Sequence, residues 1–236
     1  MAENGAGGAL APLIAIVGCD GSGKSTLARD LCLDLARTHS VEMHYLGLGS
    51  GAIGERIKRW PLIGSVTERV LSNKARRTRT EGDRIPGLAT ALVVYGFSLL
   101  RRRRFRAVLA ARRAGVIVVT DRYPQTEVPG FYDGPGLSAA SSGSRAVARL
   151  AAREARMYAW MASFRPDLVI RLDVDLATAH ARKPDHDSDL LRRKIAATPL
   201  LGFAGAAIVD IDARAPYAEV RRQAWAALLP VVRDVG

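Results

Sequence analysis

The chain has 236 residues, of which 48% are hydrophobic and 25% are charged. This length and composition are typical of one globular domain with a sizeable buried core. The two cysteines, Cys19 and Cys32, are too few for a disulfide framework and indicate reduced thiols in the cytoplasm. Residues 1–12 lack the basic segment and cleavage site of a secretion signal. We therefore expect a disordered tail over residues 1–11 and a single domain over residues 12–236.

The net charge is +12, and arginine supplies most of the positive charge, with 30 Arg against 5 Lys. This excess favours anionic partners. The sequence contains no nucleic-acid-binding motif and no interleaved aromatic residues, so we expect no nucleic-acid partner. The apolar run Leu88–Leu100 is too short to span a bilayer and indicates a buried helix. The arginines at 101–104 leave a membrane-surface helix as the weaker alternative.

The first half of the chain alternates between apolar runs and helical patterns. Residues 13–17 are a continuous apolar run, as in a strand buried on both faces of a parallel sheet. A glycine-rich turn follows, and then a helix with Leu27, Leu31 and Leu35 on one face. The predicted helices cover 24–38, one or two segments within 55–85, and 88–114, and further strands cover 41–46 and 116–119.

The second half begins with a segment rich in Pro, Gly and Ser over residues 124–143, which predicts a long loop. Ser144 is expected to cap the next helix, which ends before Pro166. The predicted helices cover 144–164, 175–182, 190–198 and 216–232, and the predicted strands cover 167–174 and 207–211. Five strands that alternate with helices predict an α/β fold, in which a five-stranded parallel sheet carries helices on both faces.

Residues 18–25 match the phosphate-loop pattern G-x-x-x-x-G-K-[ST] in full. The glycines let the backbone curl so that successive N–H groups point at one phosphate, and the following helix adds the positive end of its dipole. Lys24 is expected to bridge the β- and γ-phosphates, and the Ser25 hydroxyl is expected to ligate Mg²⁺. Because the match lies between a buried strand and a helix, it predicts an ATP site of the P-loop NTPase fold.

A second acidic position follows the third predicted strand. Asp121 lies at the sheet edge where ligands bind in open α/β folds, and it is expected to hold Mg²⁺ through water. Arg122 beside it can hold a phosphate bidentately. The alternative interpretation is a helix-capping Asp next to a surface Arg.

Other classes of P-loop protein need signatures that this chain lacks. A GTP-dependent switch needs Asn-Lys-x-Asp, and residues 73–76 lack the final Asp. Residues 133–136 fit D-x-x-G, but they lie in a Pro/Gly-rich loop and are interpreted as a chance match. A transporter ATPase would show an L-S-G-G-Q-type signature, which residues 141–145 do not provide.

A small-molecule kinase needs a mobile basic lid that expels water and brings cations onto the transferred phosphoryl group. Residues 179–187, Ala-His-Ala-Arg-Lys-Pro-Asp-His-Asp, are the predicted lid, and a solvated charged turn is the alternative. The basic run at 192–194 is interpreted as a solvated helix face.

The two specific motifs resemble those of the thymidylate kinase family of nucleoside monophosphate kinases. Residues 18–26 look like its G-x-[DE]-G-x-G-K-[ST]-T loop, and residues 121–123 look like its D-R-[YFH] segment. The resemblance covers residues 12–230 and implies a single P-loop kinase domain with ATP and Mg²⁺ as cofactors. The reaction it implies is dTMP + ATP to dTDP + ADP.

The resemblance also implies roles for individual residues. Asp20 would contact a hydroxyl of the acceptor's sugar, and Arg122 and Tyr123 would bind the acceptor. Gly21 is similar to that of bacterial members whose catalytic arginine comes from the lid, which implies Arg182. The implied catalytic set is Lys24, Asp121, Arg122, Arg182 and Lys183; the nucleotide-binding set is Gly18, Asp20, Gly21, Ser22, Gly23, Lys24, Ser25, Thr26 and Arg182; and the metal ligands are Ser25 and Asp121.

The segments that would shape the acceptor pocket depart from the family. Residues 46–51 stand where the family has an Arg-Glu-Pro-Gly-type segment, and residues 124–129 replace its Ala-Tyr-Gln-type segment. Other small anionic acceptors therefore stay open, among them another nucleotide, a sugar phosphate or a lipid-linked group. A non-enzymatic ATP-binding regulator is a further alternative, and a homodimer also stays open.

Overall fold

The computed structural model describes residues 10–47, 87–130, 133–137 and 144–233. The helices predicted within residues 55–85 lie outside these ranges, as does most of the tail predicted over residues 1–11. Ala11 is buried, and its backbone N–H donates to the carbonyl of Arg112 at 3.2 Å. The described part of the domain therefore begins against the end of a long helix.

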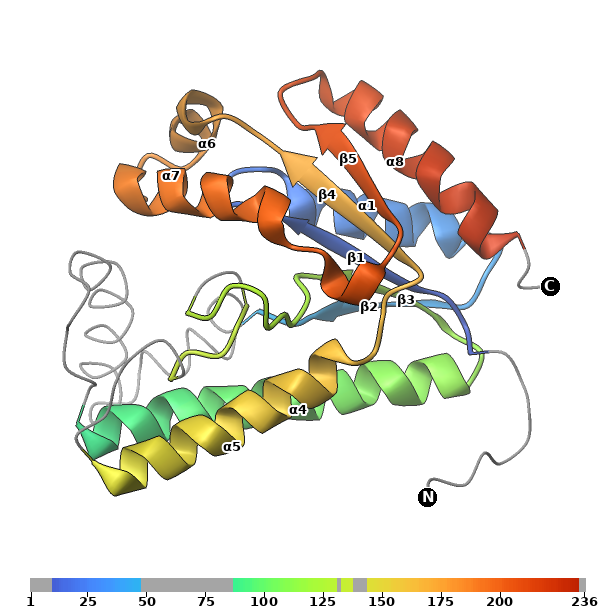
Figure 1. Cartoon of the computed structure of the whole chain (residues 1–236). Coiled ribbons are helices and arrows are strands. Elements are labelled where there is room, and N and C mark those ends of the chain that lie inside the picture. Colours follow the sequence, from blue (N-terminus) through green and yellow to red (C-terminus); the bar gives the residue numbers. More distant parts are fainter. Residues whose placement is uncertain (1–9, 48–86, 131–132, 138–143, 234–236) are drawn as a thin grey trace.

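Five parallel strands form one sheet in the order β2-β3-β1-β4-β5 (Figure 1). Ile16 of β1 aligns with Asp121 of β3 on one side and with Ile170 of β4 on the other, so β1 is central and buried along its whole length. The strands are β1 (Leu13–Gly18), β2 (Val41–Tyr45), β3 (Ile117–Asp121), β4 (Leu168–Asp173) and β5 (Ile208–Asp212). The predicted α/β fold is confirmed, and with its glycine-rich turn after β1 it is the P-loop NTPase fold.

Helices cover both faces of the sheet (Figure 1). On one face, α4 and α5 pack against each other, and α4 also contacts β2 and β3. On the other face, α1 contacts the strands β1 to β3, and α8 contacts β4 and β5. These helices are α1 (Lys24–Leu35), α4 (Leu88–Arg113), α5 (Arg145–Ala162) and α8 (Tyr217–Val232).

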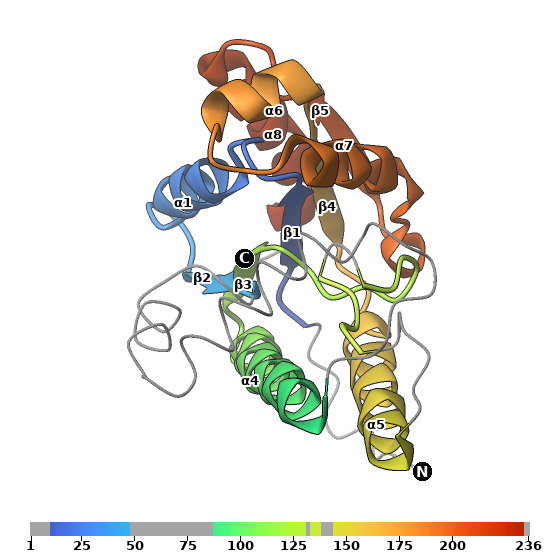
Figure 2. The same cartoon turned by 90° about the vertical axis from the view of Figure 1, so that its left-hand side faces the viewer.

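A smaller helical unit lies beyond the carboxyl ends of β1 and β4 (Figures 1 and 2). It consists of α6 (Leu176–Arg182) and α7 (Ser188–Ala197), and each helix begins at an aspartate whose side chain accepts backbone N–H groups. Arg171 of β4 fixes the segment after α7, since its guanidinium donates to the carbonyl of Leu201 at 3.1 Å and pairs with Asp210. Two short 3₁₀ turns, Thr198–Leu200 and Phe203–Gly205, lie in this segment. The predicted lid over residues 179–187 covers the end of α6 and the turn before α7.

Several element boundaries differ from the predictions. Helix α1 ends at Leu35 rather than at residue 38, because the backbone tightens there: the N–H of Thr38 donates to the carbonyl of Leu35 at 3.0 Å. Ser144 precedes α5 as predicted, but its side chain makes no capping hydrogen bond. Within the arginine run of α4, Arg101 is fully buried, and Arg104 donates to the carbonyl of Gly47 at 2.8 Å.

Among the described residues, no helix combines the length and the apolar character that crossing a bilayer requires.

Candidate functional site

The glycine-rich turn joins the end of β1 to the first turn of α1 and has the backbone that its sequence predicts. Gly21 has a φ of +87°, and a Cβ atom there would lie 2.8 Å from the carbonyl oxygen of Ala179 in α6. Gly23 has a φ of +90° and immediately precedes α1. Both conformations favour glycine, because L side chains rarely adopt positive φ. The close approach at Gly21 also places α6 directly against the loop.

Lys24 folds back over the loop from which α1 begins. Its side chain is buried, and Nζ donates to the carbonyl of Cys19 at 3.1 Å and lies 3.7 Å from Oδ1 of Asp20. Burial lowers the pKa of Lys24, and the nearby positive charge of Arg122 adds to this effect, while Asp20 opposes it. An anionic ligand in the loop would offset this cost of burial by giving the ammonium group a negative partner.

Ser25 and Asp121, the two predicted metal ligands, lie in direct contact. The Ser25 hydroxyl donates to Oδ2 of Asp121 at 2.5 Å. Asp121 is only 1% exposed, and its other carboxylate oxygen, Oδ1, has no hydrogen-bond partner among the described residues. A buried carboxylate oxygen without a partner beside a hydroxyl fits Mg²⁺, which prefers oxygen ligands. The described residues contain no group of three or more His, Cys, Asp or Glu that could hold a metal alone, so phosphates or water would have to supply the other ligands.

Asp20 gathers three cations from three different elements. Nη2 of Arg122, after β3, donates to its Oδ1 at 2.8 Å, Lys24 of α1 lies nearby, and Lys194 of α7 pairs with its Oδ2. Burial alone would raise the pKa of Asp20, but Lys194, Arg122 and Lys24 together hold it well below its usual range. The carboxylate is therefore ionised and links the loop, the end of β3 and α7.

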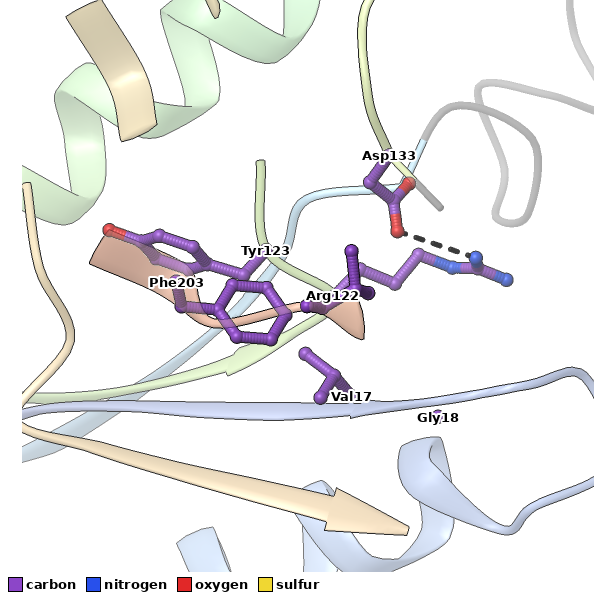
Figure 3. Close-up of a pocket in the computed structure, with 7 residues that line it drawn as sticks. Val17, Gly18, Arg122, Tyr123, Asp133 and Phe203 are labelled. Atoms are coloured by element: carbon purple, nitrogen blue, oxygen red, sulfur yellow. Dashed lines mark ion pairs between the residues drawn. The ribbon is translucent and has the colours of Figure 1, made fainter. Parts of the chain in front are cut away.

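A small pocket lies at the carboxyl ends of β1 and β3 (Figure 3). Its charged side is formed by Arg122 and Asp133, whose Nη1 and Oδ2 atoms lie 3.5 Å apart. Its apolar side consists of Val17, Tyr123, Leu201 and Phe203. The rings of Tyr123 and Phe203 meet edge to face, with centroids 6.3 Å apart. The small pocket therefore combines an apolar wall with a charged edge.

Tyr123 contributes its ring to this pocket and not its hydroxyl. The hydroxyl donates to the carbonyl of Phe164 at 2.5 Å, and Figure 3 shows it pointing away from Arg122. Burial raises the pKa of this hydroxyl, which keeps it protonated. In this arrangement, the predicted contact between Tyr123 and an acceptor involves the aromatic face.

Of the two basic residues in the predicted lid, one lies at the loop and the other does not. Arg182 at the end of α6 donates to the carbonyl of Gly21 at 3.3 Å and to that of Ala213 at 3.0 Å. Its guanidinium therefore lies at the phosphate loop while bound to backbone oxygens. Lys183 directly follows α6 and is exposed. Of the two, the structure brings only Arg182 into contact with the loop.

The remaining residues of the predicted nucleotide set lie in the loop or directly beside it. Ser22 is buried, and its hydroxyl lacks a partner among the described residues. Thr26 lies in the first turn of α1 with an exposed side chain. Gly18 ends β1 and is packed so closely that a Cβ atom would lie 2.8 Å from the carbonyl oxygen of Leu172.

Comparison with known proteins gives relatives that match most of the chain. The chain is 46% identical over 225 residues to YghR, an uncharacterized ATP-binding protein of Escherichia coli (strain K12), which covers 94% of this chain and 89% of YghR. It is 48% identical over 209 residues to YghS, an uncharacterized ATP-binding protein of the same strain, with 88% of each chain covered. The chain belongs to the YghR/YghS family. No family model matches it.

In this member of the YghR/YghS family, sequence reasoning missed three charged residues at the site. Lys194 was interpreted as part of a solvated helix face, but it pairs with Asp20. Asp133 was interpreted as part of a chance motif, but it lines the pocket beside Arg122. Arg101 is fully buried and binds Asp133. The signal available for Arg101 was helical spacing, since it falls on the same face of α4 as the buried Phe105.

Proposed function

We propose that this chain is a cytoplasmic, ATP- and Mg²⁺-dependent phosphotransferase that moves the γ-phosphoryl group of ATP to a small anionic acceptor. The names of YghR and YghS as ATP-binding proteins support the nucleotide. The main support for a kinase is the 2.8 Å contact between Asp20 of the phosphate loop and Arg122 after β3. It joins the ATP-side loop to a residue that lines the pocket at the ends of β1 and β3, and transfer between two bound molecules requires neighbouring sites.

In this reaction, an acceptor oxygen would form a bond to the γ-phosphorus while the bond from that phosphorus to the β–γ bridging oxygen breaks. ADP leaves with the bonding electrons. Lys24 would bind the β- and γ-phosphate oxygens after leaving the Cys19 carbonyl, and Arg182 would leave its backbone partners to reach the transferred group. Ser25 and Asp121 would hold Mg²⁺, which neutralises phosphate charge when bound.

The acceptor that we propose to test first is dTMP, on the strength of the two motifs at residues 18–26 and 121–123. Groups of the kinds that bind a nucleoside monophosphate line this small pocket: an apolar wall with two aromatic rings, and a guanidinium at its edge. Another nucleotide, a sugar phosphate or a lipid-linked group would meet the same edge, so these acceptors are tested beside dTMP. A non-enzymatic ATP-binding regulator is the alternative from another class.

The deciding experiment measures ADP release from ATP·Mg²⁺ in the presence of dTMP, other nucleoside monophosphates, sugar phosphates and their neutral parents. A kinase shows turnover that one acceptor stimulates and that Lys24→Ala lowers by about 10²-fold or more. Tight ATP binding without stimulation by any acceptor would favour the regulator. Near-normal turnover in a folded Lys24→Ala protein would overturn the kinase assignment.

A further inference from the structure

Three charged side chains contact one another in a row, from the buried side of α4 to the edge of the pocket. Arg101 is fully buried; its Nη1 donates to the backbone carbonyl of Asp133 at 2.7 Å, and its Nη2 donates to Oδ1 of the same residue at 2.5 Å. The Arg101 Nη1 group also donates to the hydroxyl of Tyr158 at 2.9 Å. The other carboxylate oxygen of Asp133, Oδ2, faces Arg122 at 3.5 Å. Arg101 thus holds both the backbone and the side chain of the residue that contacts Arg122.

Both residues at the pocket end of this chain have unusual backbone conformations. Arg122 has a φ of +74° and Asp133 a φ of +64°, in the left-handed region that side chains other than glycine rarely adopt. Such a conformation is energetically unfavourable and persists only where surrounding contacts enforce it. Ionic contacts of both residues meet at the Arg122 guanidinium. Strain of this kind is concentrated at functional sites, which raises the question of which group the Arg122 guanidinium is held in place to bind.

The segment that carries Asp133 is clamped at its other end as well. The backbone N–H of Leu137 donates to Oε2 of Glu154 at 2.6 Å, and the Ser98 hydroxyl donates to Oε1 of Glu154 at 2.6 Å. Glu154 of α5 and Ser98 of α4 are both fully buried. Buried ionic groups are seldom needed for stability, since apolar residues of similar volume often serve as well. The two clamps are better explained by the position that they impose on residues 133–137.

We propose that Asp133 and Arg101 are positioning residues that fix the plane of the Arg122 guanidinium for an anionic group of the acceptor; this inference rests on the proposed function. Arg122 lies between two carboxylates on different elements, with Asp20 on the loop side and Asp133 on the pocket side. Its Nε has no hydrogen-bond partner among the described residues. A guanidinium whose plane is already set loses less conformational entropy when it binds a phosphate or carboxylate through two hydrogen bonds.

The test replaces the carboxylate by its nearly isosteric amide, Asp133→Asn, in the full chain. The matched control is Asp34→Asn, which changes an arginine–aspartate pair between α1 and α8 that lies apart from the pocket. The first readout needs no acceptor: it is the Nε–Hε resonance of Arg122 in protein labelled with ¹⁵N-arginine, assigned from its loss in Arg122→Lys. We expect this resonance to shift and broaden in Asp133→Asn and to stay unchanged in Asp34→Asn.

The second readout separates binding of the two substrates, using the acceptor that the ADP-release screen identifies. Asp133→Asn should raise the acceptor KM by about tenfold and leave the ATP KM within about twofold, because the change acts through Arg122. Unchanged Arg122 resonances in a folded variant would overturn the proposal. If no acceptor stimulates turnover, the proposed function fails, while the resonance of Arg122 still decides the positioning role.

A second variant covers the case in which Asp133→Asn fails to fold because Arg101 is left buried without its charged partner. The double variant Arg101→Met/Asp133→Asn removes both buried charges together. We expect it to fold and to show the same change in the Arg122 resonance and in the acceptor KM. A folded double variant with a wild-type Arg122 resonance and acceptor KM would refute the positioning role of both residues.

Discussion

Lys194 of α7 forms an ion pair with Asp20 of the phosphate loop, although 174 positions separate the two residues in the sequence. The pair attaches α7 to the loop at the carboxylate that also binds Arg122. Because the Lys194 side chain is 20% exposed and lies beside the loop, it adds to the positive potential that an incoming polyphosphate meets.

Lys194→Ala should therefore weaken ATP binding by about tenfold, or about 1.4 kcal/mol. Removing this cation leaves Asp20 less neutralised and closer to repelling the phosphates. Arg192→Ala is the matched control, since Arg192 lies on the same helix, is 64% exposed and pairs with Asp189. The measurement is the dissociation constant of ATP by equilibrium titration. Equal constants for Lys194→Ala and Arg192→Ala would show that Lys194 serves only to hold α7.

Asp121→Asn should raise the Mg²⁺ concentration needed for half-maximal turnover by about 10- to 100-fold. The substitution removes the negative charge beside Ser25 and keeps the size of the side chain, so the Ser25 hydroxyl keeps an oxygen to donate to. The assay is ADP release over a Mg²⁺ series, with Asp34→Asn as the control. An unchanged Mg²⁺ dependence would make Asp121 a structural partner of Ser25 only.

The strands and the phosphate loop could be predicted because their signals are local. A continuous apolar run such as residues 13–17 identifies a buried strand without knowledge of its neighbours, and the glycine spacing defines the loop. The contacts of Lys194 and Asp133 depend on how distant segments pack, and no local pattern encodes them. Glu154 gave a partial signal, because it lies two helical turns after the buried Val147 on the same face of α5. The positive φ of Arg122 had no sequence signal, since no residue type or local pattern at this position predicts it.

Arg182→Ala should lower kcat by about 10³-fold or more while changing ATP affinity little. In the structure, the Arg182 guanidinium is bound to the carbonyls of Gly21 and Ala213, so it contributes to the transition state only after exchanging these partners. Single-turnover kinetics and ATP titration separate the two effects, with Arg192→Ala again as the control. A loss of ATP affinity with kcat preserved would make Arg182 a nucleotide clamp and leave the catalytic cation elsewhere.

Cys19, inside the phosphate loop, should react slowly with iodoacetamide at pH 8. Burial raises the pKa of its thiol from 9.0 to about 11, with Lys24 acting in the opposite direction. The folded protein then carries about a hundredfold less thiolate at this position than an unfolded chain. Between pH 9 and 11 the unfolded thiol releases its proton while the folded thiol keeps it, so the free energy of unfolding should fall with rising pH in this window.

Mass spectrometry of alkylated peptides and urea unfolding at pH 8 and pH 10 test this expectation. Cys19→Ala is the control, because it leaves Cys32, whose pKa burial also raises to about 11, as the only thiol. The variant should lose less stability than the wild type between the two pH values. Rapid labelling of Cys19 at pH 8 would contradict the burial of this thiol.

The acceptor is expected to carry an anionic group that Arg122 binds. The carboxylates around Arg122 determine how strongly it binds that group. Its guanidinium already pairs with Asp20 at 2.8 Å and faces Asp133 at 3.5 Å, so an acceptor phosphate must share it with both carboxylates. The contact with Asp133 is the longer one, and the side chain is 22% exposed beside the pocket. The pocket side of the guanidinium is therefore where a second anion would bind.

Arg122→Ala should raise the acceptor KM by about 10- to 100-fold, the loss of one or two charge-assisted hydrogen bonds, and leave the ATP KM nearly unchanged. The acceptor KM of Arg122→Lys should lie between those of the wild type and of Arg122→Ala, because lysine keeps the charge and loses the planar pair of donors. Steady-state kinetics with each substrate varied in turn measures both constants, and Asp34→Asn serves as the control. If the ATP KM rises while the acceptor KM holds, Arg122 belongs to the nucleotide side. If a neutral acceptor is turned over as well as its phosphate, the pocket binds no acceptor anion through this guanidinium.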